Sequence, residues 1–210
     1  MPHFSSAGVE IAYEVEGEGK PILLVHGFSA TAADNWVRTG WVQALTRARY
    51  KVVRFDLRGH GASQKLYNAD DYDIEKMAGD ALALLDHLGI EKADLMGFSM
   101  GAGIAMRLAA RHGERFGKVV LAGMGVKALE PAKPGNPVAD AMEAADASIV
   151  SDRSARAFRL YAESLGQDLK AIAACAREPR RGGAEEAARA VRNETLVIAG
   201  CPVYPSDADD

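Results

Sequence analysis

Cysteine is scarce in this 210-residue sequence, and long apolar runs are absent. The two cysteines, Cys175 and Cys201, form no C-x-x-C pair or metal-type spacing, so we expect free thiols in a reducing compartment and no metal site. Residues 1–10 lack the basic and apolar segments of a signal peptide, and no run approaches the ~18 apolar residues of a membrane span. These absences predict a cytoplasmic protein with no membrane partner.

Charge of one sign is not concentrated either. Lys and Arg number 25 against 29 Asp and Glu, which gives a net charge of −4. Nucleic acids and anionic membranes are bound by clustered Lys and Arg, so we expect neither as a partner. A small-molecule substrate is the expected partner instead.

The common cofactor motifs are missing. No P-loop, H-E-x-x-H or calcium-loop pattern is present. Gly101-Ala102-Gly103 continues without the third glycine of a dinucleotide fingerprint, and these glycines fall inside a predicted helix. We therefore expect no cofactor.

Strand and helix patterns alternate along the first 125 residues. Such alternation predicts an α/β fold with a mostly parallel sheet covered by helices on both faces. The expected strands are residues 9–15, 21–26, 50–55, 93–98 and 118–122. The expected helices are residues 36–47, 73–88 and 100–111, with Asp73 as the N-cap of the second and Gly89 just past its end.

The pattern changes at position 126. No strand is evident from 126 to 192, where residues 139–147, 154–165, 169–177 and 184–192 all have a helical pattern. Residues 195–199 return to a buried-strand pattern. We therefore predict a core made of residues 1–125 and 193–210, with residues 126–192 inserted as a helical cap.

The strongest chemical motif is a G-x-S-x-G between a predicted strand and a predicted helix, Gly97-Phe98-Ser99-Met100-Gly101. In that context the serine occupies a sharp, strained turn, and Gly97 and Gly101 provide the small neighbours that the turn requires. The N-terminus of the following helix directs N–H groups and its positive dipole end at the reacting oxygen. A chance G-x-S-x-G in an ordinary turn is the alternative, and the strand–turn–helix context disfavours it. Ser99 is the predicted nucleophile.

Two further segments follow predicted strands. In His26-Gly27-Phe28, the backbone N–H of Phe28 could join that of Met100 in an oxyanion hole, with the ring of His26 holding the loop. Residues 56–63 form a glycine-rich turn in which Asp56 and Arg58 pair or bond to backbone. We interpret this turn as scaffold rather than as a source of catalytic Asp56 or His60.

In their order along the chain, these three segments resemble the α/β-hydrolase superfamily, in the branch with esterases, carbon–carbon bond hydrolases and cofactor-free haloperoxidases. The resemblance runs from about residue 9 to residue 200. It implies an eight-stranded sheet with a cap after the sixth strand, Ser99 as nucleophile, a histidine after the last strand and an acid after the preceding one. Ester cleavage in the family runs through an acyl-enzyme.

The sequence departs from that family pattern after the cap. None of the five histidines (His3, His26, His60, His87, His112) follows residue 192, so the catalytic histidine is absent. Val203 stands where the family places its acid, which leaves Asp207 as the nearest candidate. We expect a chain cut short or shifted in reading frame near position 200, lacking the last strand and its flanking helices. The strand at 195–199 would then be an uncovered sheet edge through which copies could associate.

Three functional hypotheses follow. The first is a serine hydrolase of a small ester or similar carbonyl substrate, impaired by the absent histidine, with Met142, Phe158, Leu160 and Tyr161 of the cap lining an apolar pocket. The second is a non-catalytic protein that keeps the fold as a ligand pocket. The third is an enzyme whose missing strand and histidine come from a partner chain.

Overall fold

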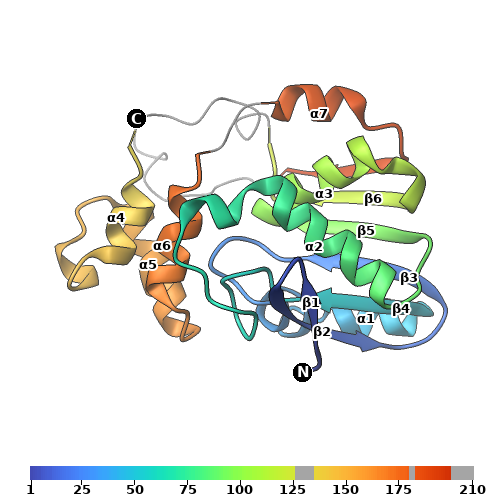
Figure 1. The fold of residues 1–210 in the computed structure, drawn as a ribbon, viewed down its shortest axis with the longest axis horizontal. Helices are drawn as coiled ribbons and strands as arrows, with labels where there is room; N and C mark the ends of the chain where they lie inside the picture. Colours follow the sequence, from blue (N-terminus) through green and yellow to red (C-terminus); the bar gives the residue numbers. More distant parts are fainter. Residues whose placement is uncertain (126–134, 180–182, 200–210) are drawn as a thin grey trace, which may run out of the picture.

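The computed structural model describes residues 1–125, 135–179 and 183–199. Within these residues, seven strands form one sheet in the order β1-β2-β4-β3-β5-β6-β7 (Figure 1). The strands are β1 His3–Ser6, β2 Val9–Glu16, β3 Lys20–Val25, β4 Tyr50–Phe55, β5 Ala93–Phe98, β6 Phe116–Ala122 and β7 Thr195–Ile198. β1 pairs antiparallel with β2 and β2 with β4, whereas every pairing from β4 to β7 is parallel. The predicted α/β fold with a mostly parallel sheet is confirmed.

Helices cover both faces of this sheet (Figure 1). The α-helices are α1 Trp41–Arg47, α2 Ile74–His87, α3 Met100–Arg111, α4 Pro137–Glu143, α5 Arg153–Ser164, α6 Leu169–Arg177 and α7 Ala184–Ala190. Short turns of other helix types are η1 Ala33–Val37, η2 Ala69–Tyr72, η3 Gly113–Arg115 and η5 Ala147–Ile149. None of the described helices is both long and apolar enough to cross a bilayer.

The central strand β3 shows how the two faces divide the core. Leu23 and Val25 pack in the cluster that contains the apolar sides of α2, α3 and α7. Ile22 and Leu24 point to the other face and pack with Trp36 of η1 and with α1. A strand buried on both faces has a continuous apolar sequence, which is why the run PILLV predicted it.

Helix α2 has the ends that its sequence predicted. The Asp73 side chain accepts a hydrogen bond from the backbone N–H of Glu75 at 2.8 Å, and Gly89 has a φ of +64° just past the last turn. Its buried face includes Met77, Ala81 and Leu84, so the helical spacing of apolar residues faces the core.

The prediction of one helix over residues 36–47 is wrong. Gly40, with a φ of +82°, separates the π-helical turn η1 from α1. A left-handed residue cannot continue a right-handed helix, and glycine adopts it without a steric penalty. The sequence analysis also missed β1, a four-residue strand in which only Phe4 and Ser6 are buried.

The described helices of residues 126–192, the range that the sequence analysis predicts to be a cap, divide into two groups. Helices α4, α5 and α6 pack together beyond the carboxyl ends of the strands, where α6 also contacts η2 (Figure 1). Helix α7 instead packs on α3, and Ala187 joins the core cluster of the sheet. The predicted cap range, 126–192, therefore includes one helix, α7, that packs with the core of the sheet instead of with α4, α5 and α6.

The last described strand, β7, is an exposed edge. It pairs with β6 on one side, while Leu196, Val197 and Ile198 are 58%, 56% and 42% exposed.

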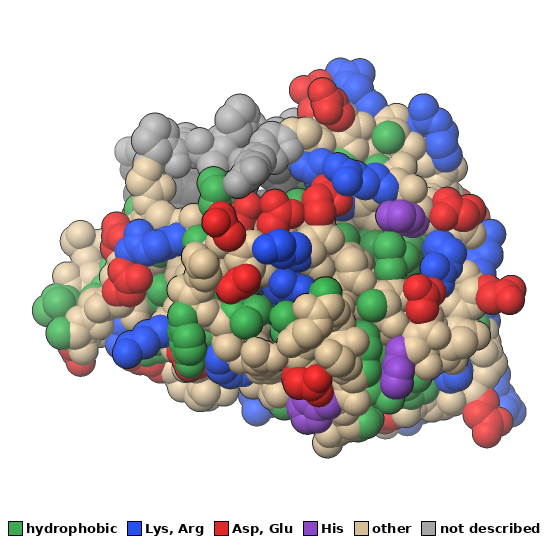
Figure 2. Space-filling view, in the orientation of Figure 1, with side chains coloured by type: hydrophobic (Ala, Val, Ile, Leu, Met, Phe, Trp, Pro, Cys, Tyr) green, Lys and Arg blue, Asp and Glu red, His purple; other side chains and the backbone are tan. Residues whose placement is uncertain are grey.

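The surface drawn in Figure 2 carries charges of both signs. Acidic and basic side chains are interspersed on it, without a broad field of one sign.

Candidate active site

Ser99 lies in a sharp turn between β5 and α3. Its backbone has φ +53° and ψ −116°, a conformation that non-glycine residues rarely adopt. Such strain costs on the order of 1–3 kcal/mol and persists only where neighbouring contacts hold it. The N–H of Ser99 donates to the carbonyl of Ala122 at 2.8 Å, and its own carbonyl accepts from the N–H of Ala102 at 2.9 Å. The side chain is exposed, which makes its hydroxyl available to a ligand.

The two motif glycines permit this turn. A Cβ added to Gly97 would lie 2.2 Å from the carbonyl oxygen of Gly101, and one added to Gly101 would lie 2.1 Å from that of Val25. Both distances are far below contact, and both obstructing atoms belong to the backbone, which cannot rotate away. The sequence places glycine where the sheet and the helix approach most closely.

The segment of residues 26–30, called the oxyanion loop below, runs beside Ser99. A Cβ on Gly27 would be 3.4 Å from the Cβ of Ser99. The backbone N–H groups of Phe28 and Met100 donate no hydrogen bond to any group in the described part of the chain. Met100 is the first residue of α3, where N–H groups lack intrahelical acceptors. Two free donors beside one strained serine match the arrangement of an oxyanion hole.

Two buried histidines, His26 within the oxyanion loop and His60 outside it, hold the backbone of this loop in place. Nε2 of His26 accepts the N–H of Leu57 at 2.9 Å, so its Nδ1 carries the proton and donates to the carbonyl of Gly27 at 2.8 Å. Nε2 of His60 accepts the N–H of Ser29 at 3.2 Å, and its Nδ1 donates to the carbonyl of Arg58 at 3.0 Å. The two rings meet edge to face at 5.4 Å. Both nitrogens of each ring are therefore used in holding backbone.

Burial keeps both rings neutral. It lowers the pKa of His26, and burial together with the neighbouring His26 lowers the pKa of His60 to about 3. A neutral ring is required here, because a protonated one could not accept the N–H of Leu57 or Ser29. His26 and His60 therefore act as structural supports in this geometry rather than as bases for Ser99.

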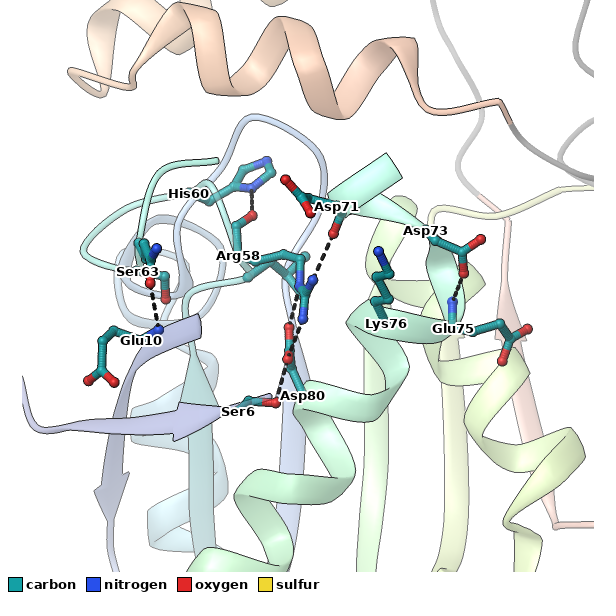
Figure 3. A network of polar contacts seen from close by, with 12 residues as sticks. Ser6, Glu10, Arg58, His60, Ser63, Asp71, Asp73, Glu75, Lys76 and Asp80 are labelled. Carbon is teal, nitrogen blue, oxygen red and sulfur yellow. Dashed lines mark hydrogen bonds and ion pairs between the residues drawn. The ribbon is translucent and has the colours of Figure 1, made fainter. Parts of the chain in front are cut away.

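The turn at residues 56–63 is held by polar contacts to backbone. The two oxygens of Asp56 accept the N–H groups of Ala32 and Ala62, each at 2.8 Å. Arg58 does not pair with Asp56; it forms an ion pair with Asp80 of α2 (Figure 3). These contacts place the turn in the scaffold and leave Asp56 without a free oxygen directed at Ser99.

A family model described as alpha/beta hydrolase fold matches residues 20–173. This range covers more than half of the chain and includes both the oxyanion loop and Ser99. The chain belongs to the α/β-hydrolase family. The family resemblance predicted from the three sequence segments is confirmed.

Relatives of this α/β hydrolase are named for several different reactions. A 2-hydroxymuconate semialdehyde hydrolase from Pseudomonas sp. (strain CF600) is 33% identical over 215 residues, which cover 93% of this chain and 74% of the relative. A non-heme haloperoxidase from Rhodococcus erythropolis is 37% identical over 120 residues, covering 57% and 42% respectively. The chain thus spans about two fifths of the length of the haloperoxidases it matches.

The fold of this α/β hydrolase is also similar to that of a solved lactonase. The enol-lactonase from Burkholderia xenovorans LB400 superimposes with a TM-score of 0.78 at 25% identity, covering 95% of this chain and 81% of that one. The fold described above is therefore shared with a protein of known structure.

The acid and base of a triad are not assembled among the described residues of this α/β hydrolase. His3 and His87 lie near β1, β2 and α2, and His112 lies at the end of α3 remote from Ser99. No described side chain hydrogen-bonds to the hydroxyl of Ser99. Asp207, Val203 and Cys201, which the sequence analysis considered, lie outside the described residues.

A cavity of about 620 Å³ lies among the cap helices and residues 67–69. Its described lining includes Met142 but not Ser99, Phe28 or Met100. Of the other cap residues predicted to line a pocket, Phe158 meets the ring of Phe28 at 5.8 Å, whereas Leu160 is 50% exposed. The described residues also contain no cluster of three or more His, Cys, Asp or Glu able to hold a metal ion.

The sequence analysis missed the polar residues that fasten the oxyanion loop. Oδ1 of Asn35 accepts the N–H of Gly27 at 2.8 Å, and Gln167, from the cap, bonds to the carbonyls of Ser29 and Ala30. Both are isolated amides outside any motif. Nothing in the sequence marks them, because their partners are backbone groups, eight positions away for Asn35 and more than 100 positions away for Gln167.

Proposed function

We propose that this chain cleaves a small ester or lactone through an acyl-enzyme formed on Ser99. The observation that carries the proposal is the pair of unengaged N–H groups, of Phe28 and Met100, beside a strained and exposed serine. The enol-lactonase likeness supports the choice of a carboxylic ester as substrate class. A serine rather than an aspartate at this turn disfavours epoxide opening and dehalogenation.

The acylation step requires two features of this geometry. The Ser99 oxygen forms a bond to the carbonyl carbon, and the displaced electron pair moves onto the carbonyl oxygen. The N–H groups of Phe28 and Met100 stabilise that oxyanion, where one such donor is worth about 3–4 kcal/mol in other enzymes. The intermediate then expels the alcohol, which takes up a proton, and water releases the acid from the acyl-enzyme.

The proton of the Ser99 hydroxyl has no described acceptor. We propose that this proton is transferred to water and that the turnover of the 210-residue chain is therefore slow. In serine proteases, loss of a triad member leaves roughly 10³–10⁴-fold acceleration over water, supplied by the oxyanion hole and by binding. A serine that reacts with activated reagents but turns over poorly is the expected behaviour.

Labelling with a fluorophosphonate probe tests this function. We expect covalent labelling at Ser99, detected by peptide mass spectrometry, and none in Ser99→Ala. The exposed Ser164, whose hydroxyl donates to the carbonyl of Tyr161, serves as the matched control in Ser164→Ala. A folded wild-type chain that stays unlabelled would contradict the proposal.

A ligand-binding protein without catalysis is the second candidate. It is favoured because none of the five histidines, all within the described residues, forms a hydrogen bond with the Ser99 hydroxyl. Binding of an ester that persists with equal affinity in Ser99→Ala, without hydrolysis by either protein, would support it. Hydrolysis by the wild type that disappears in Ser99→Ala would exclude it.

We further propose that the β7 edge pairs with the same edge of a second copy. The strand has one partner, β6, among the described residues, and three consecutive apolar side chains of β7 are exposed. An uncapped edge offers unpaired N–H and carbonyl groups to another strand. A two-fold arrangement would join the two edges antiparallel and cover Val197 of each copy.

A further inference from the structure

Gln167 connects the cap to the oxyanion loop through its side-chain amide. It lies between α5 and α6, is 8% exposed, and is separated from its partners by more than 100 positions in the sequence. Nε2 donates to the carbonyl of Ala30 at 2.8 Å and to that of Ser29 at 3.3 Å, while Oε1 accepts the N–H of Gly61 at 3.0 Å.

The three partners determine the orientation of this amide. Two carbonyls face its nitrogen and one N–H faces its oxygen, so rotating the amide by half a turn would oppose like groups at every contact. The side chain thus satisfies backbone groups of both the oxyanion loop and the turn at residues 56–63. A buried amide with every contact used in one orientation is a specific connection.

The residue that Gln167 holds is itself strained. Ser29 has a φ of +53°, and its buried hydroxyl has no hydrogen-bond partner in the described structure. Its peptide groups are held from both sides: the N–H by His60 at 3.2 Å and the carbonyl by Gln167. Without these contacts, relaxation toward negative φ would be favoured.

The position of Ala30 affects the oxyanion hole through one peptide group, the one between Gly27 and Phe28. The N–H of Ala30 donates to the carbonyl of Gly27 at 3.3 Å, and the ring of His26 donates to the same oxygen at 2.8 Å. That carbonyl and the N–H of Phe28 belong to a single planar peptide and point in opposite directions. Whatever orients the Gly27 carbonyl therefore orients the Phe28 N–H.

We propose that Gln167 is a positioning residue, which holds Ser29 and Ala30 so that the N–H of Phe28 points at the carbonyl oxygen of a substrate on Ser99. The inference rests on the proposed acyl transfer at Ser99. It assigns the cap a role in catalysis besides covering the site: the placement of the α5–α6 connection determines the geometry of the oxyanion hole. Gln167 acts through backbone and touches no reacting atom.

The test compares Gln167→Met, which keeps the volume and removes all three hydrogen bonds, with a matched variant at another contact between the core and the cap. Tyr67→Phe is that control, because it removes one hydrogen bond between the core and the cap, to Asp168 at 3.0 Å, without touching the oxyanion loop. Fluorophosphonate labelling separates binding from reaction as an inhibition constant and a maximal rate. We expect Gln167→Met to lower the maximal rate about tenfold or more, with the inhibition constant within about twofold. Tyr67→Phe should leave both unchanged.

Gln167→Glu is a second variant in case the Met variant does not fold. It keeps an acceptor for the N–H of Gly61 but replaces the donor to Ala30, so the same loss of maximal rate is expected. A folded Met or Glu variant that labels within twofold of the wild type would overturn the inference.

Amide hydrogen exchange gives a readout that does not depend on activity. Exchange of the Ser29 and Ala30 N–H groups should accelerate at least about tenfold in Gln167→Met and stay unchanged in Tyr67→Phe. An unlabelled wild type would refute the proposed function alone. Unchanged exchange at these two amides in the Met variant would refute the positioning role alone.

Discussion

The guanidinium of Arg58 donates two hydrogen bonds to the carboxylate of Asp80, from Nε at 2.7 Å and from Nη2 at 2.8 Å. Both side chains are almost fully buried. The Ser6 hydroxyl donates to the same carboxylate at 2.6 Å, and Nη1 of Arg58 donates to the carbonyl of Asp71 at 2.7 Å (Figure 3). This network joins β1, α2, η2 and the turn that carries His60, so it anchors the support of the oxyanion loop.

Removing one partner of this pair should be costly. We expect Asp80→Ala to lower the free energy of unfolding by about 3–5 kcal/mol, because it leaves a buried guanidinium without its counter-charge. Urea denaturation followed by circular dichroism measures the change. The exposed pair Arg189–Glu185 is the control, since Glu185→Ala should leave the urea midpoint unchanged. The double variant Arg58→Met/Asp80→Leu should recover much of the loss, and an equally unstable double variant would contradict this reasoning.

Substitution of glycine should have opposite effects in the turn at Ser99 and in an ordinary helix. Gly101→Ala would place a Cβ 2.1 Å from the carbonyl oxygen of Val25, so we expect loss of folding or of Ser99 labelling. Gly79, in α2, has nothing within 4 Å of an added Cβ, and Gly79→Ala should stabilise the chain by about 0.5–1 kcal/mol. Expression yield, melting temperature and probe labelling check both variants. A folded, reactive Gly101→Ala protein would show that the turn is not closed as described.

The buried histidines should make the fold sensitive to acid. In the folded chain the pKa of His60 is lowered from 6.5 to about 3, and that of His26 is also lowered. Between those values the unfolded chain binds more protons than the folded one. The contribution of His60 to stability is therefore full above pH 6.5 and is lost as the pH falls toward 3, by about 1 kcal/mol per pH unit, and the lowered pKa of His26 acts in the same direction.

Calorimetry between pH 8 and pH 4 measures this decline, and His60→Gln isolates the contribution of His60. A glutamine amide can accept from Ser29 and donate to Arg58 without taking up a proton, so its melting temperature should fall less steeply below pH 6.5. Parallel pH curves for the variant and the wild type would show that His60 does not contribute.

The β7 edge predicts association that depends on concentration. Sedimentation velocity should reveal dimers or larger species whose fraction rises with protein concentration. Val197→Lys places a charge on an apolar, 56% exposed edge position and should shift the distribution toward monomer. Lys51→Ala, on β4 in the interior of the sheet order, should have no such effect. A wild-type chain that remains monomeric at all concentrations would rule out the edge pairing.

Much of the fold and the strained turn at Ser99 could be predicted from the sequence, because their signals are local. Apolar runs such as residues 21–25 mark strands buried on both faces, and Asp73 and Gly89 mark the ends of α2. Gly97 and Gly101 around Ser99 indicate a turn that no larger residue allows. In each case the physical requirement is met by residues within a few positions of one another.

Only the tertiary structure decided how Ser99 is surrounded. The partners of Gln167 are more than 100 positions away in sequence, Arg58 pairs with Asp80 rather than Asp56, and α7 packs on α3 rather than with the other cap helices. These contacts depend on which backbone groups and helix faces meet when distant segments pack together. Every residue has the same backbone groups, so such contacts leave no pattern in the sequence. The amino-acid sequence by itself determined a strained serine on an α/β sheet; the packing of distant segments determined the orientation of the N–H groups beside it.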